Sequence, residues 1–279
     1  MQLRVVHTTG FEYDGKAVAS YNQARMTPVT MPGQIVVHSR LEVTPKPWTY
    51  DYRDYFGTHV TAFEVVDPHD SLTVTATSTV QTSRPPTPPP NTTWEALAER
   101  EVADRWTEYL TLPDLVAPPA DFARRAATVR DESARPGEAA RALCRLVADE
   151  VEHRPGSTDV QTPAAEAWGQ RAGVCQDMVH LVIGGLRSLG IPARYVSGYF
   201  HPSAEPVVGE QVAGESHAWV EWWDDGWHPF DLTNDREPSD RYVTVATGRD
   251  YGDVKPLSGI YSGAATSHMF VEVEVTRLA

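Results

Sequence analysis

The sequence predicts an α+β fold in which an N-terminal antiparallel β-sandwich precedes a core with one helix packed on an antiparallel sheet. Residues 3–82 contain short segments rich in β-branched and aromatic residues, and residues 83–91 are dominated by proline. The rest of the chain has helical patterns followed by strand patterns. With 279 residues and 41% hydrophobic content, the chain is long enough to bury one large core or two smaller ones.

Six strands are predicted before the proline-rich run, because Gly, Pro and Asp separate segments of high β propensity. The predicted strands are residues 3–13, 17–26, 34–43, 50–55, 60–66 and 72–82. The proline-rich run cannot join a helix or a sheet, so it predicts an extended spacer. We therefore expect a sandwich domain over residues 1–83, a linker over 84–93 and a second domain over 94–279.

The second domain is predicted to begin with helices and to end with strands. Helical patterns cover residues 94–110, 121–129, 137–152, 163–171 and 175–189, and strand patterns cover 193–200, 215–223, 227–232, 242–247 and 268–276. Helices first and an antiparallel sheet afterwards are typical of an α+β core.

Cys175, one of only two cysteines, stands at the start of the helical segment 175–189. Apolar residues recur there at three- and four-residue spacing, and Gly190 and Pro192 end the segment. In the first turn of a helix, unpaired N–H groups and the macrodipole favour a thiolate, and one such N–H faces a developing oxyanion. A buried structural cysteine is the alternative, and it is the better interpretation for a lone cysteine without partners.

A thiolate nucleophile needs a base, and the base needs an orienting group. His217 lies on predicted strand 215–223, and Asp231 lies on predicted strand 227–232. If the loop is the three residues 224–226, the even separation places both side chains on one face as diagonal neighbours. A two-residue turn over 225–226 would place them on opposite faces unless a bulge intervenes. We adopt the three-residue loop, which predicts a triad of Cys175, His217 and Asp231.

Five motifs follow one another along the second domain: Gly-Val-Cys-Gln-Asp at 173–177, the segment 186–199, Ser-His-Ala-Trp-Val-Glu at 216–221, Phe-Asp-Leu-Thr-Asn at 230–234 and the segment 248–254. In order and spacing they resemble the bacterial transglutaminase-like proteins of the papain-like thiol enzyme superfamily. The resemblance extends over nearly the whole chain, because the first domain is similar to the small β domain that precedes the catalytic core in this subgroup. One departure is Leu232, which stands where a proline is expected after the aspartate.

The resemblance implies that residues 94–279 are a catalytic domain, with Cys175 as nucleophile, His217 as general base and acid, and Asp231 as its orienting group. The ordered triad without calcium ligands makes a cysteine protease-like hydrolase of peptide or isopeptide amides the leading hypothesis. Protein-glutamine acyl transfer or deamidation, and a peptide-binding scaffold without activity, stay open because the same triad and fold serve different reactions. No Asp-x-Asp-x-Asp-Gly loop is present, so neither a metal nor another cofactor is predicted.

Further residues are candidates for contacts with substrate or oxyanion: Gln161, Trp168, Gln176, Asp177, Trp219, Arg249, Asp250 and Tyr251. We expect Asp177 to cap its own helix or to pair with His180, rather than to face the cleft and bind a substrate cation. The Trp residues near 219–227 are more typical of a core than of a substrate platform.

The net charge of −14 argues against nucleic acid or an anionic membrane as a partner. The sequence starts directly with a strand pattern and shows no signal-peptide pattern, so a cytoplasmic location is expected. Cys144 is predicted to be a core residue, since a disulfide would consume the nucleophile. The expected partner is a peptide or protein substrate, and the oligomeric state is not predicted.

Overall fold

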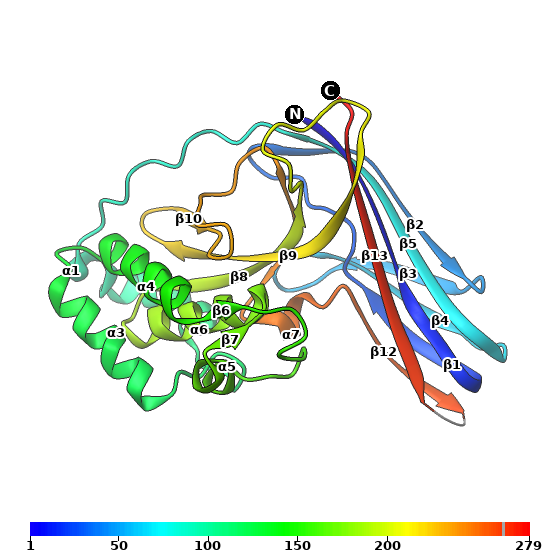
Figure 1. Cartoon of the computed structure of the whole chain (residues 1–279), viewed down its shortest axis with the longest axis horizontal. Helices are drawn as coiled ribbons and strands as arrows, with labels where there is room; N and C mark the ends of the chain where they lie inside the picture. The colour runs from blue at the N-terminus through cyan, green and yellow to red at the C-terminus, as the bar shows by residue number, and fades with distance from the viewer. Residues whose placement is uncertain (264–265) are drawn as a thin grey trace.

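The computed structural model describes residues 1–263 and 266–279 and has an antiparallel sheet at one end and helices at the other (Figure 1). The first strands are β1 (Gln2–Ala24), β2 (Gln34–Thr44), β3 (Trp48–Arg53), β4 (His59–Val65) and β5 (His69–Thr82). These strands lie where the alternating segments of the sequence predict them. The two short segments 3–13 and 17–26 form the one long strand β1.

Strand β1 bends at Gly15, whose φ of 109° lies in the region that favours glycine. Its first half pairs with β5 and with β13 (Ser267–Arg277), whereas its second half pairs with β4 and β12 (Leu257–Gly263). The two halves of this curled sheet enclose an apolar cluster that includes Met26, Phe63 and Leu72. The predicted β-sandwich character of this region follows from that packing.

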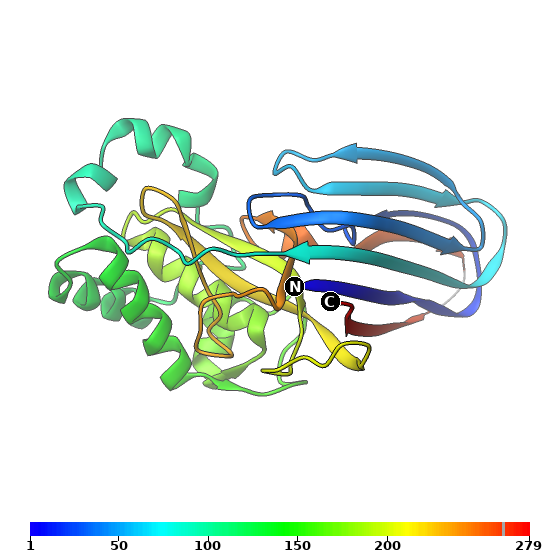
Figure 2. The ribbon, with the colours of Figure 1, turned by 90° about the horizontal axis from the view of Figure 1, so that it is seen from above.

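The helices form the other end of the molecule, seen at the left of Figure 2. They are α1 (Trp94–Leu97), α2 (Arg100–Arg105), η1 (Thr107–Leu110), α3 (Ala120–Glu132), α4 (Pro136–Glu150), α5 (Ala164–Gln170), α6 (Cys175–Ser188) and α7 (Tyr251–Val254). The segment 94–110, predicted to have one helical pattern, is divided into three short helices. No helix in the described part of the chain is both long and apolar enough to cross a membrane.

Helix α6 packs against β8 (Ala193–Phe200) and β9 (Gln211–Trp223) on one side and against α3, α4 and α5 on the other. Its buried residues Leu181, Ile183 and Leu186 belong to the same cluster as Leu143 of α4 and Val220 of β9. The short strands β6 (Glu152–His153) and β7 (Ala172–Gly173) pair in parallel just before α6, and β10 (Trp227–Phe230) and β11 (Tyr242–Gly248) extend the sheet beyond β9 and β8. These observations confirm the predicted α+β fold with the cysteine helix on an antiparallel sheet.

The C-terminal strands do not follow the domain boundary expected from the proline-rich segment. Strand β13 pairs with β1 on one side and with β9 on the other, and β12 pairs with β1. Residues 257–277, which the sequence places in the second domain, therefore complete the sheet of the first. Strand pairing depends on contacts distant in sequence, so the local pattern that predicts a strand does not specify which sheet it joins.

Candidate active site

Cys175 is the first residue of α6 and is partly exposed, as expected from the pattern that begins there. The turn before it is held by Asp177, whose carboxylate accepts hydrogen bonds from the backbone N–H of Val174 at 2.7 Å and from the hydroxyl of Thr158 at 2.6 Å. This cap leaves the sulfur at the helix N-terminus, where the macrodipole stabilises negative charge.

The hairpin of β9 and β10 has the predicted three-residue loop, since Trp227 pairs with Trp223 and leaves residues 224–226 between them. Asp225 in this loop has a φ of 53°. The loop places His217 and Asp231 on one face, and Nε2 of His217 lies 2.7 Å from Oδ2 of Asp231. The predicted register is thereby confirmed.

Asp231 is fully buried and is held by several donors besides His217. Its Oδ2 accepts hydrogen bonds from the Tyr242 hydroxyl at 2.7 Å and from Nδ2 of Asn234 at 2.8 Å, and its Oδ1 accepts the N–H of Thr233 at 3.0 Å. Burial alone would raise the pKa of Asp231, but the hydrogen bonds and the charge of His217 hold it below its usual value. The residue is therefore a carboxylate at neutral pH.

His217 lies between this carboxylate and Cys175. Burial alone would lower the pKa of His217, but its hydrogen bonds to Asp231 and Cys175 and the charges of both raise it to about 10. Because Nε2 faces Asp231, Nδ1 is the ring nitrogen left for the sulfur. The imidazolium form of His217 therefore places a positive charge beside the sulfur of Cys175.

Two cavities meet at these residues. The first, of about 400 Å³, is lined on one wall by Tyr195 and Tyr251 and on another by Val271 and Val273 of β13. The second, of about 280 Å³, lies toward Phe200, Thr233 and Asn234. Residues shared by both are His153, Cys175, Gly214 and His217. The cleft thus extends to both sides of the Cys175–His217 pair.

Two tyrosines stand beside the sulfur. Burial raises the pKa of Tyr195 well above its usual value and also raises that of Tyr251, and the charge of Cys175 contributes in both cases. The backbone N–H of Tyr251 donates to Nε2 of the buried His180 at 3.1 Å. Burial lowers the pKa of His180 to about 3, so this ring stays neutral and accepts that bond.

Three of the candidate contact residues lie away from the cleft or have their polar groups engaged. The N–H of Gln161 donates to the carboxylate of Asp159 at 2.8 Å. The indole of Trp168 is buried and donates to Asp121 at 2.7 Å. Trp219 is fully buried and packs edge to face on Tyr242. The last two are core residues, since neither lines a cavity that contains Cys175.

Gln176 lines the cleft, and its side-chain amide lies 3.4 Å from the carbonyl oxygen of Val160. Asp177 is fully buried, caps the helix through its bond to the Val174 N–H and lines neither cavity that contains Cys175. The predicted alternative pairing of Asp177 with His180 is wrong, because the His180 Nε2 bonds the Tyr251 backbone instead. The cap requires only a contact between residues three positions apart, Val174 and Asp177, and so does not depend on distant parts of the chain.

In segment 249–251, two residues stabilise the surrounding structure and one lines the cleft. Arg249 bridges Asp253 at 2.9 Å and Glu108 at 3.3 Å, so it ties α7 to η1. Asp250 is the N-cap of α7 and accepts the N–H of Gly252 at 2.7 Å. Of these candidates only Tyr251 lines the cleft.

Sequence patterns missed Tyr195, Tyr242, Asn234 and the cleft wall from β13. Tyr195 alternates with buried apolar residues of β8, which is the pattern of any core strand. Asn234 follows Asp231 by three residues, and that spacing could have indicated a turn around a carboxylate. No group of three or more His, Cys, Asp or Glu side chains that could hold a metal ion occurs among the described residues.

Two family models match the chain. The model for the bacterial transglutaminase-like N-terminal region matches residues 3–81, and the model for the transglutaminase-like superfamily matches residues 122–232. The second range contains Cys175, His217 and Asp231.

Similar proteins are found in several bacteria. The chain is 44% identical over 281 residues to an uncharacterised protein of Mycobacterium leprae, covering 100% of this chain and 99% of that one. It is 30% identical over 122 residues to a protein-glutamine gamma-glutamyltransferase of Pseudomonas aeruginosa, covering 39% of this chain and 18% of that enzyme. The crystal structure of a proposed cysteine protease from Cytophaga hutchinsonii has a TM-score of 0.75 at 24% identity, covering 98% of this chain and 90% of that one, which shows a shared fold.

Proposed function

Because this chain belongs to the transglutaminase-like superfamily, we propose that it is a thiol hydrolase that cleaves peptide or isopeptide amide bonds. The observation that carries the proposal is the hydrogen-bonded pair of His217 and Asp231 in the same cleft as Cys175. Nucleophile, base and orienting group in contact are what this chemistry requires.

In the proposed reaction, the Cys175 thiolate attacks the amide carbonyl and forms a tetrahedral intermediate whose oxyanion faces the Cys175 backbone N–H. The imidazolium of His217 donates its proton to the leaving nitrogen, the C–N bond breaks and a thioester remains. His217, now neutral, takes a proton from water, whose oxygen attacks the thioester. The acid product leaves and the thiolate and imidazolium are restored. Asp231 holds the ring throughout and stays ionised.

The shape of the cleft supports a polypeptide substrate. Cavities lie on both sides of the Cys175–His217 pair, so a chain has room before and after the scissile bond. The wall that Val271 and Val273 form in the larger cavity is apolar, whereas the smaller cavity offers the polar residues Thr233 and Asn234. An extended chain with alternating side chains fits such walls better than a single side chain does.

The alternative is acyl transfer to an amine, which uses the same thioester, and the similarity to a protein-glutamine gamma-glutamyltransferase favours this second function. Incubation of the protein with peptide amides and a fluorescent primary amine distinguishes the two. We expect release of acid to exceed incorporation of the amine. Incorporation in excess of acid release would refute hydrolysis and establish transfer as the main reaction.

A peptide-binding scaffold without activity is tested by the alkylation of Cys175. We expect iodoacetamide to label Cys175 rapidly below pH 7, because His217 is protonated beside it. Cys144 is fully buried, so it contributes little label, and Cys175→Ala gives the background. Slow labelling with the pH dependence of an ordinary thiol would favour the scaffold.

A cytoplasmic location is part of the proposal and rests on the sequence pattern alone. Fractionation of cells that produce the chain with its natural start would test it, and recovery outside the cytoplasmic fraction would contradict it. The absence of nucleic-acid and membrane partners rests likewise on the net charge of −14.

A further inference from the structure

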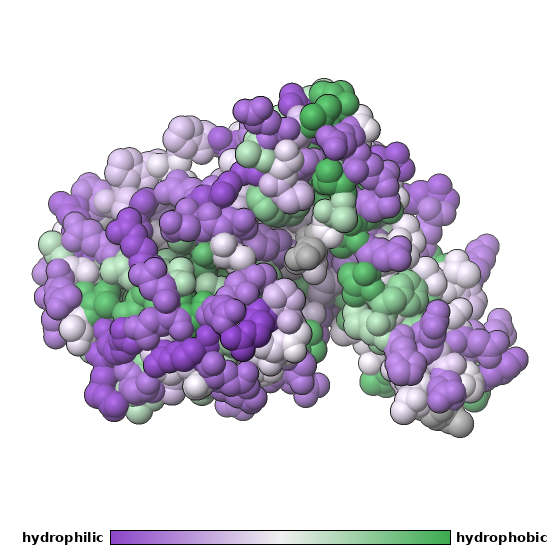
Figure 3. All heavy atoms as spheres, viewed as in Figure 1, coloured by the Kyte–Doolittle hydropathy of each residue, from purple (hydrophilic) through white to green (hydrophobic). Residues whose placement is uncertain are grey.

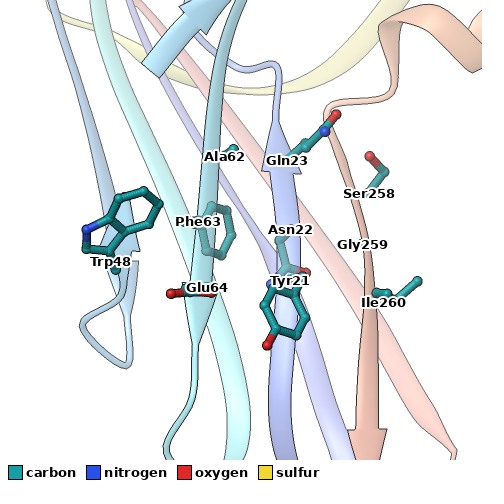
Figure 4. Close-up of a pocket in the computed structure, with 10 residues that line it drawn as sticks. All are labelled: Tyr21, Asn22, Gln23, Trp48, Ala62, Phe63, Glu64, Ser258, Gly259 and Ile260. Carbon is teal, nitrogen blue, oxygen red and sulfur yellow. The ribbon is translucent and has the colours of Figure 1, made fainter. Parts of the chain in front are cut away.

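A separate cavity of about 490 Å³ lies on the outer face of the sheet formed by β12, β1, β4 and β3 (Figure 4). Large apolar side chains are exposed there: Tyr21 is 52%, Trp48 is 66% and Ile260 is 73% exposed. An exposed apolar surface that is gathered into a hollow is a common mark of a binding site. This sheet face has no part in the triad chemistry.

The residues of this face form one row across four strands. Ile260 of β12 pairs with Tyr21 of β1, Tyr21 pairs with Glu64 of β4, and Glu64 pairs with Trp48 of β3. Residues paired in this way share one face of the sheet. The Glu64 carboxylate therefore lies between two aromatic residues, and Figure 4 shows it extending toward the Trp48 side. A carboxylate between aromatic rings offers a cation both an opposite charge and π faces.

The segment 256–260 leads from the Cys175 cleft to the row. Pro256 lines the 400 Å³ cavity that contains Cys175, whereas Ser258 and Ile260 line the 490 Å³ cavity of the row. These residues alternate with the buried Leu257, so they share the outer face of the strand. In Figure 3 a notch separates the helical end from the sheet end, and apolar surface lies on the sheet side of it. A chain that leaves the cleft at Pro256 and follows β12 would meet the row at Ser258 and Ile260.

We propose that the row of Trp48, Glu64, Tyr21 and Ile260 docks a segment of the polypeptide substrate that carries a lysine or arginine side chain. The inference rests on the proposed amide hydrolysis at Cys175, because continuity with that cleft identifies the occupant. From Pro256 to Ile260 the strand rises about 13 Å, and Glu64 lies two strands farther across, about 10 Å. An extended segment of roughly five residues spans the resulting distance of about 16 Å. The basic residue thus lies at least about five positions from the scissile amide.

The binding test uses the full chain with Cys175→Ala, which cannot form a thioester. The probes are two fluorescein-labelled libraries of 14-residue peptides, one with a fixed lysine and the other with a fixed norleucine, measured by fluorescence anisotropy. We expect the lysine library to bind about three- to tenfold more tightly, the effect of one partly exposed cation beside aromatic rings and a carboxylate. Glu64→Gln and Trp48→Ala, each added to Cys175→Ala, should abolish this preference. Glu272→Gln, which removes an exposed carboxylate on β13, should preserve it.

Cleavage of the same peptides by the unsubstituted chain and by Glu64→Gln separates the two proposals. We expect Glu64→Gln to raise KM for lysine peptides threefold or more and to leave KM for norleucine peptides as it was. If Glu64→Gln and the unsubstituted chain cleave lysine peptides with equal KM values, or if both libraries bind equally, the docking site is refuted and amide hydrolysis is not affected. If the unsubstituted chain cleaves no peptide but binds the lysine library through Glu64, amide hydrolysis fails while the basic-segment site stands. Trp48 is largely exposed, so loss of folding does not complicate its variant.

Discussion

Replacement of Asp231 by asparagine should move the alkaline limit of activity by several pH units. His217 has a pKa of about 10 against an ordinary value of 6.5, a difference that corresponds to roughly 5 kcal/mol of stabilisation of the imidazolium. Burial opposes this difference, so Asp231 and Cys175 together supply more than the net value. Without the carboxylate, burial still lowers the pKa of His217, and only Cys175 raises it. We therefore expect this pKa to fall to 6.5 or below.

In the proposed reaction the leaving nitrogen receives its proton from His217, so we expect activity to be lost as pH rises through the pKa of this residue. We expect kcat/KM of the unsubstituted chain to fall near pH 10. For Asp231→Asn the fall should occur near pH 6.5 or lower, with at least about a thirtyfold loss at pH 8, because a group with that pKa is about 3% protonated there. Hydrolysis of a peptide amide between pH 5 and 10.5, with thermal unfolding at each pH, measures both.

Asp70→Asn provides the control, because Asp70 is an exposed carboxylate outside the cleft. Its profile should coincide with that of the unsubstituted chain. If Asp231→Asn kept its alkaline limit near pH 10 while remaining folded, the assignment of Asp231 as the source of the raised pKa would be wrong. The same conclusion would follow if the activity of the unsubstituted chain already fell near pH 6.5.

Three further changes have expected outcomes. Tyr242→Phe removes a hydroxyl that donates to Asp231 and should lower the free energy of unfolding by about 1–3 kcal/mol in urea titrations; an unchanged value would mean that water replaces the donor. The pKa of His217 is raised on folding, so its contribution to stability is complete below pH 6.5 and is lost as pH rises toward 10. His217→Gln should therefore reduce the change in the free energy of unfolding between pH 6.5 and 10. An equal change in both proteins would mean that His217 is not the group with the raised pKa. Gly198→Ala places a Cβ 2.0 Å from a carbonyl oxygen of β11 and should lower the free energy of unfolding by more than about 3 kcal/mol. Gly226→Ala, with open space around the new Cβ, should leave it nearly unchanged. Similar melting temperatures for the two variants would refute the close packing of β8 on β11 behind His217.

Local patterns were sufficient to predict the start of α6 and the face shared by His217 and Asp231. The helix start depends on the three- and four-residue spacing after Cys175, and the shared face depends only on the number of residues in one loop. Both are decided within about twenty residues of chain. The same holds for Asp177, whose cap closes within three residues.

The support of the site is decided at longer range and was not predictable in the same way. Tyr242 reaches Asp231 because β11 pairs with β8, whose other edge pairs with β9. Nothing near residue 242 in the sequence encodes that order of strands. The same limit explains why β12 was missed and why the pairing of β13 with β1, beside its pairing with β9, was not predicted, since its alternation is equally compatible with either neighbour.

The role of the N-terminal sheet follows from these long-range pairings. Strand β13 is hydrogen-bonded to β1 and β9 together, so the sheet that carries His217 is continuous with the N-terminal sheet. His7 of β1 is buried against the hydroxyl of Tyr199 at 2.9 Å, and burial lowers the pKa of His7 to about 4, so this contact stays uncharged at neutral pH. Because Val271 and Val273 of β13 form a wall of the Cys175 cleft, the N-terminal sheet holds part of this cleft in place. A chain cut at the proline-rich segment would therefore lack β1, which holds that wall through its pairing with β13.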